Sequence, residues 1–211
     1  MKYDIQEILS NAFSYEKYMQ EMQLFAKLGK TSGPNQSESM VAYTKLNFTR
    51  MKRLNKTSMP GHRIMEQLKT LPFHTTWVMI TEAWCGDAAQ NIPFIFKVAD
   101  LAGEKVDFNL IYRDQNIAYM DDFLTNGGRS IPKLIVYRTS GMEVLTTWGP
   151  RPKPVQEIVL AYKNTISDKI PLHAFLEEIQ RWYNADKNNS LENELFHTFQ
   201  EVIESQINKT V

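Results

Sequence analysis

Apolar residues recur at helical spacing through the first part of the chain. They predict one helix over about residues 2–28, ended by Gly29, and a second helix over residues 38–55. A polar loop at residues 30–37 separates the two, and a short helix follows at residues 63–70. The chain therefore begins with a helical segment.

The pattern changes in the middle of the chain, where strands are predicted. Residues 76–81 have a continuous apolar centre, which is typical of a strand buried on both faces, and residues 106–112 alternate. Residues 133–137 and 143–148 indicate a hairpin. The helices predicted between and after these strands cover residues 87–102, 116–126 and 154–165. This order predicts an α/β fold, with a small central mixed sheet and helices on both faces.

Helical periodicity returns near the C-terminus. One helix is predicted from Pro171 to Tyr183, and the pair Asn189 and Glu192 resembles the capping pattern that starts a final helix. The predicted organisation has three parts: an N-terminal helical extension packed on the core (1–61), a central α/β domain (62–166) and a C-terminal helical extension (167–211).

The composition is that of an ordinary globular protein. The 24 basic and 24 acidic residues cancel, so charge provides no argument for a nucleic-acid or membrane partner. The sequence has neither a signal peptide nor an apolar run long enough to span a membrane, and it has one cysteine. These features predict a cytoplasmic protein in a reducing environment. The four histidines share no ligand spacing, so no metal site is expected.

The candidate chemistry centres on Cys85, at the junction between a predicted strand and a predicted helix. Backbone N–H groups at a helix N-terminus stabilise a thiolate, whereas the nearby carboxylate of Asp87 opposes it. We therefore expect a mildly lowered pKa for Cys85. Because no second cysteine exists, thiol chemistry here needs an external partner.

Two separated motifs together resemble the thioredoxin family. Trp84-Cys85-Gly86 resembles the start of the family's Trp-Cys-Gly-Pro-Cys site, and Ile131-Pro132, about 45 residues later, resembles its Ile-Pro step. The resemblance covers about residues 62–166 and implies a thioredoxin-like fold, with a cis peptide bond before the proline facing the cysteine. Gly149 matches a glycine that lines the same groove. The residues that the resemblance implies for substrate binding are Trp84, Gly86, Ile131, Pro132 and Gly149.

The sequence departs from the family pattern at three positions. Ala88 replaces the second cysteine, Met79 replaces a buried acid that relays protons, and Asp87 replaces a proline. The expected activity is therefore monothiol: Cys85 exchanges with a protein or small-molecule disulfide and forms a mixed disulfide. Asp87 is either its proton acceptor or an acid that stabilises the helix start. No resident cofactor is expected, and an external low-molecular-weight thiol or a reductase would release the product.

Other interpretations of the same residues stay open at this stage. The protein is alternatively a non-catalytic binding module that docks an extended peptide or a partner subunit, or Cys85 senses peroxide by forming a sulfenic acid. Cys85 is otherwise an inert buried residue, and Trp84 a core aromatic. Glu82, at the end of the preceding strand, is expected to be solvated. The sequence leaves open the natural partner, the oligomeric state and whether the terminal helices cover Cys85.

Overall fold

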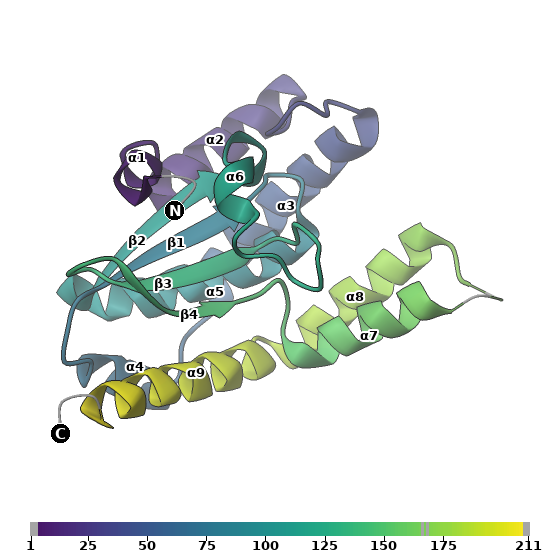
Figure 1. The fold of residues 1–211 in the computed structure, drawn as a ribbon. Helices are drawn as coiled ribbons and strands as arrows, with labels where there is room; N and C mark the ends of the chain where they lie inside the picture. The colour runs from purple at the N-terminus through teal and green to yellow at the C-terminus, as the bar shows by residue number, and fades with distance from the viewer. Residues whose placement is uncertain (1–3, 166, 168, 209–211) are drawn as a thin grey trace.

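The computed structural model describes residues 4–165, 167 and 169–208 (Figure 1). The predicted helix start at residue 2 and the predicted domain boundary at residue 166 lie outside these residues. Within the described ranges, no helix has both the length and the apolar character needed to cross a bilayer.

Four strands form one mixed sheet in the order β2-β1-β3-β4. β1 (Thr75–Thr81) is parallel to β2 (Val106–Tyr112), and β3 (Lys133–Arg138) is antiparallel to both β1 and β4 (Glu143–Trp148). Every residue of β1 is buried, as its apolar centre predicts for a central strand. The structure thus confirms the predicted α/β fold class.

Helices cover both faces of the sheet. α5 (Gly86–Leu101) connects β1 to β2 and lies behind the sheet in Figure 1, whereas α6 (Ile117–Met120) lies in front. The Tyr119 hydroxyl of α6 hydrogen-bonds the Tyr137 hydroxyl of β3 at 2.7 Å, which anchors this short helix on its face. Both faces of the central strands are thereby shielded from water.

The C-terminal helix also contributes to the core of the sheet. α9 (Asn189–Asn208) places Phe199 in a stacked contact with Trp77 of β1, with the ring centroids 5.0 Å apart. Both side chains are almost completely buried. α4 (His62–Lys69) lies beside α9, and the Gly61 N–H before it donates to the Glu192 carboxylate at 3.0 Å. Glu192 thereby joins the first turn of α9 to the start of α4, and the predicted Asn189–Glu192 capping pair stays a prediction.

The first predicted helix is divided in two, so the prediction of one helix is wrong. α1 (Ile5–Ser10) and α2 (Tyr15–Leu28) are separated because Phe13 pairs with Leu110 of β2 through two backbone hydrogen bonds, of 3.0 and 2.9 Å. Ser14 then caps α2 by accepting the Lys17 N–H. A hydrophobic period shows which residues are buried, but it does not show that the backbone leaves the helix to pair with a strand.

Other predicted helices differ mainly in length. α3 (Glu38–Thr57) agrees closely with the prediction, but the helix expected at residues 116–126 stops after α6. The chain beyond α6 turns instead, with positive φ at Asn126 and Gly127. α2 ends at Gly29 in the left-handed conformation, as expected.

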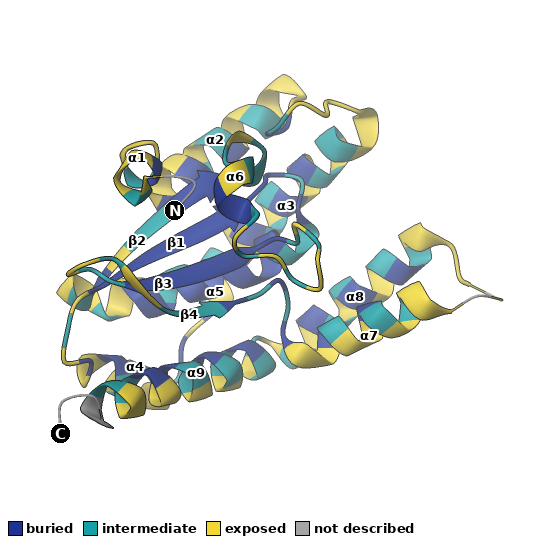
Figure 2. Cartoon of the chain, viewed as in Figure 1, coloured by how far each residue is buried: buried dark blue, intermediate teal, exposed yellow. Residues whose placement is uncertain are grey.

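α7 (Lys153–Asn164) and α8 (Leu172–Asp186) form a hairpin that projects beyond the β4 edge of the sheet. The hairpin has a small hydrophobic core of its own, separate from the main core. Its buried members are Val155, Val159, Phe175, Ile179 and Tyr183. Figure 2 shows the central strands β1 and β3 almost wholly buried, whereas both hairpin helices keep exposed outer faces. Side chains of the hairpin that its own core does not use are therefore available to line a surface beside the main domain.

Candidate functional site

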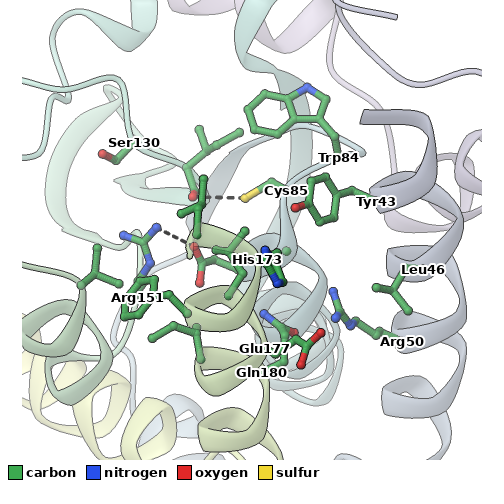
Figure 3. A pocket seen from close by; sticks show the side chains of 18 of the residues that line it. Tyr43, Leu46, Arg50, Trp84, Cys85, Ser130, Arg151, His173, Glu177 and Gln180 are labelled. Carbon is green, nitrogen blue, oxygen red and sulfur yellow. Dashed lines mark hydrogen bonds and ion pairs between the residues drawn. The ribbon is translucent and has the colours of Figure 1, made fainter. Parts of the chain in front are cut away.

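Cys85 is the N-cap residue of α5, and its sulfur has two backbone partners. The thiol donates to the Ile131 carbonyl oxygen at 3.3 Å (Figure 3), and Sγ accepts the Ala88 N–H at 3.4 Å. The residue is 7% exposed. The fold thus brings the cysteine of the first motif into direct contact with the Ile-Pro step of the second.

Burial controls the ionisation of this thiol. It raises the pKa of Cys85 to about 12, and the negative charge of Asp87 adds to the effect. The Ala88 N–H and the Arg151 guanidinium act in the opposite direction, but they are the weaker influences. The expected mildly lowered pKa is therefore wrong, because loss of water around the sulfur outweighs the helix N-terminus. At neutral pH the resting thiol is protonated.

The Ile131–Pro132 peptide bond is cis. Gly149 lies directly behind it with φ of 116°, and a Cβ at this position would overlap the Pro132 carbonyl oxygen. Among these three residues, Ile131 lines the groove described below, whereas Pro132 and Gly149 support it from behind. The resemblance-based binding roles of Pro132 and Gly149 stay predictions.

Both carboxylate oxygens of Asp87 are engaged. Oδ2 pairs with Arg151 Nη2 at 2.7 Å, and Oδ1 accepts the Tyr183 hydroxyl hydrogen at 2.9 Å. Burial raises the pKa of this carboxyl, and Arg151 and Tyr183 counteract the effect. Asp87 thereby connects the start of α5 to α8, so it has a structural role whether or not it also accepts a proton from Cys85.

A groove of about 950 Å³ runs over Cys85 between α3 and the α7–α8 hairpin. Trp84, Cys85, Gly86 and Asp87 line it together with Ile131. Figure 3 shows side chains of α3 on one side of Cys85 and side chains of α8 on the other. The sequence left open whether the terminal helices cover Cys85, and the structure answers this in part. One N-terminal helix (α3) and one C-terminal helix (α8) form walls around the thiol, and the groove between them leads to it.

Several side chains of the groove were not singled out from the sequence. Arg50 of α3 and Gln180 of α8 line the groove near Gly86, and Arg151 before α7 also lines it. Arg113 lies over the ring of Trp84 at 5.0 Å. Each lies outside the two motifs. For Arg50 and Gln180 the only sequence signal is the amphipathic character of their helices, which does not distinguish a functional polar residue from a solvated one.

Glu82 is completely buried, so the expectation that it is solvated is wrong. One oxygen accepts the Asp114 N–H at 2.9 Å and the other accepts the Ser32 hydroxyl hydrogen, while burial raises the pKa of the carboxyl.

The position of the family's proton-relay acid is occupied by Met79, which is buried in the core. In the part of the chain that the structure describes, no three His, Cys, Asp or Glu side chains gather as metal ligands.

Comparisons with known proteins concern the fold and the family of this chain. A protein of unknown function from Pseudomonas aeruginosa aligns over 99% of both chains with 12% identity and a TM-score of 0.56, which supports a shared fold. An HIV epitope-scaffold aligns over 91% of this chain and 96% of its own, with 13% identity and a TM-score of 0.46. No curated protein sequence matches. The family model described as "Thioredoxin" matches residues 33–171, which include α3 as well as the sheet. The chain belongs to the thioredoxin family.

Proposed function

We propose that this protein carries out monothiol exchange through Cys85 with a disulfide bound in the groove. The observation that carries the proposal is that the only cysteine lines the groove and contacts Ile131 at the Ile-Pro step.

The reaction needs no residue other than Cys85 to change its bonds. Its sulfur attacks one sulfur of the partner disulfide, a new S–S bond forms, and the second partner sulfur leaves as a thiolate that takes up the thiol proton. An external low-molecular-weight thiol then attacks the partner sulfur of the mixed disulfide and bonds to it, and the Cys85 sulfur leaves as a thiolate that takes up the proton of that thiol. The partner disulfide is the oxidant in the first step, and the external thiol is the reductant in the second.

The raised pKa makes this exchange slow for a free small disulfide at neutral pH. The thiolate is the attacking species, and it is rare in the resting site. A partner held in the groove offsets the low thiolate fraction through proximity. The proposal therefore fits a partner that binds first and exchanges afterwards.

Oxidised glutathione tests whether native Cys85 exchanges at all. We expect intact mass spectrometry to show one glutathionyl group added to the wild-type protein, faster as pH rises from 7 to 9, and none on Cys85→Ser. Dithiothreitol should remove the group. Exchange restricted to urea-unfolded protein, with no adduct on the native protein at pH 9, would overturn the proposal.

A binding module without catalysis is the second candidate, and one observation favours it. The thiol hydrogen is already donated to Ile131, and the sulfur is nearly inaccessible. In this case Cys85→Ser retains full partner binding, and the native wild-type protein gives no glutathione adduct.

A further inference from the structure

The lining of the groove carries an excess of positive charge. Six lining residues are Arg or Lys and two are Asp or Glu, although the whole chain has equal numbers of each. Several of these cations already have a carboxylate partner: Arg151 pairs with Asp87, and Arg181 pairs with Glu177. Among the described side chains, Arg50 has no carboxylate within the 4.0 Å ion-pair limit.

Arg50 is held in place by a neutral partner. Its Nη1 donates to Asn47 Oδ1 at 3.0 Å, and the buried Asn47 amide donates in turn to the Ala83 carbonyl at 3.0 Å. Asn47 thereby fixes the guanidinium without forming an ion pair, and the carboxylate of Asp87 acts on the Arg50 charge only through space. Such an arrangement suits an arginine that receives an anion from outside the chain.

A second donor approaches the same place from the opposite wall. A Cβ placed on Gly86 would lie 3.5 Å from Gln180 Nε2 and 3.8 Å from Arg50 Nη1. Gln180 Oε1 accepts the Gln90 amide hydrogen at 2.8 Å, which turns Nε2 toward Gly86. Donors from α3 and α8 therefore converge over a glycine that leaves room between them, directly beside Cys85.

The lining of the groove also includes exposed apolar side chains. Leu46 of α3 is 46% exposed and Leu172 of α8 is 60% exposed, and both line the groove. Large exposed apolar side chains around a cleft are typical of protein–protein contact sites. A small anion would leave these leucines in water, whereas a chain segment with apolar side chains would cover them.

We propose that the groove binds an acidic, apolar peptide segment of a partner protein, with one of its carboxylates between Arg50 and Gln180 over Gly86. This inference rests on the proposed function, because it names the class of partner that the groove delivers to Cys85. Burial lowers the pKa of Arg50 and so agrees with a poorly hydrated cation, but the group stays charged.

The test uses a cysteine-free library of random twelve-residue peptides, panned against the Cys85→Ser protein. We expect the selected peptides to be enriched in Asp or Glu together with Leu, Ile, Phe or Met, relative to the unselected library. A selected peptide is then synthesised with a fluorescent label, and its affinity is measured by anisotropy. A failure to select any peptide, or selection of peptides without acidic residues, overturns the proposal.

Groove variants, built on Cys85→Ser, show where the peptide binds. Arg50→Gln and Gly86→Ala should each weaken binding about tenfold or more, since one removes the cation and the other fills its neighbouring space. Leu46→Glu should also weaken it, because a carboxylate four residues before Arg50 on the same helix pairs with it. Lys45→Gln, which makes the same charge change on an exposed part of α3, should change affinity less than twofold. Unchanged binding to Arg50→Gln overturns the proposal.

Two further outcomes are decisive. Displacement of the peptide by a twelve-nucleotide oligothymidine at equal concentration would indicate a nucleic-acid site and overturn the inference.

Because Cys85→Ser forms no disulfide, peptide binding to it is independent of the exchange reaction. If the peptide binds but the wild-type protein forms no glutathione adduct, only the proposed exchange is contradicted. If the adduct forms but no acidic peptide binds, only this inference is contradicted.

Discussion

The carboxylate of Asp87 and the guanidinium of Arg151 lie 2.7 Å apart, and both charges act on the thiol of Cys85. Asp87 raises the pKa of that thiol and Arg151 lowers it. The pair joins the first turn of α5 to the segment leading into α7. One contact therefore links the reactivity of the cysteine to the position of the hairpin.

Replacing either partner should move the reactivity of Cys85 in opposite directions. Asp87→Asn removes the carboxylate charge, so the Cys85 pKa falls and alkylation by iodoacetamide at pH 8 becomes several-fold faster; a fall of one unit corresponds to about tenfold more thiolate. Arg151→Gln should slow the same reaction. Alkylation rates measured by intact mass spectrometry between pH 7 and 10 give the comparison, and equal rates in both variants would contradict it.

The raised thiol pKa also predicts a loss of stability in alkali. The unfolded thiol ionises near its ordinary pKa of 9.0, whereas the folded thiol stays protonated up to about 12. Between these values the unfolded state binds fewer protons, so the free energy of unfolding falls as pH rises. Below pH 9 the group has no effect on the pH dependence.

Urea unfolding at pH 8 and pH 10.5 measures this slope. We expect the wild-type protein to lose more stability than Cys85→Ser over the interval, because serine does not ionise. Buried tyrosines contribute equally to both proteins and cancel. Parallel losses would mean that the folded thiol ionises like a free one.

Gly149 should tolerate substitution less well than another glycine with positive φ. In Gly149→Ala the new methyl group meets the Pro132 carbonyl, so we expect a loss of more than about 3 kcal/mol in unfolding free energy. Gly127 has φ of 73° but open space around it, so Gly127→Ala should lose about 1 kcal/mol. Urea denaturation of both variants tests the difference, and similar losses would refute the predicted overlap.

Phe199 should be as important to stability as a residue of the central domain. Phe199→Ala removes the ring stacked on Trp77 and should lower the unfolding free energy by about 3–5 kcal/mol in a single cooperative transition. Asn193, an exposed residue of the same helix, provides the control. Asn193→Ala should change the unfolding free energy by less than about 0.5 kcal/mol. A separate early transition would show instead that α9 unfolds independently.

The sheet was predictable because its strands carry strong and unambiguous patterns. The apolar centre of β1, the alternation of β2 and the hairpin of β3 and β4 all appear in the sequence before any contact is known. The family motifs also indicated that Cys85 meets Ile131, which lies far away in sequence. Local patterns were sufficient wherever the backbone followed one regular period.

The groove was not predictable, because its walls come from helices whose placement depends on long-range contacts. Nothing near Arg50 or Gln180 in the sequence indicates that these residues converge over Gly86. The pKa of Cys85 was misjudged for a similar reason. Its burial depends on distant segments, whereas the helix N-terminus and Asp87 are visible from the local sequence alone.

The hairpin wall has a consequence for how this protein diverges from its relatives. α7 and α8 have a hydrophobic core of their own beyond the last strand, and Tyr183 anchors them to Asp87. The exposed outer faces of α7 and α8 can therefore change in sequence without disturbing the packing of the sheet. A change at Tyr183, by contrast, reaches Asp87, whose charge acts on the Cys85 thiol.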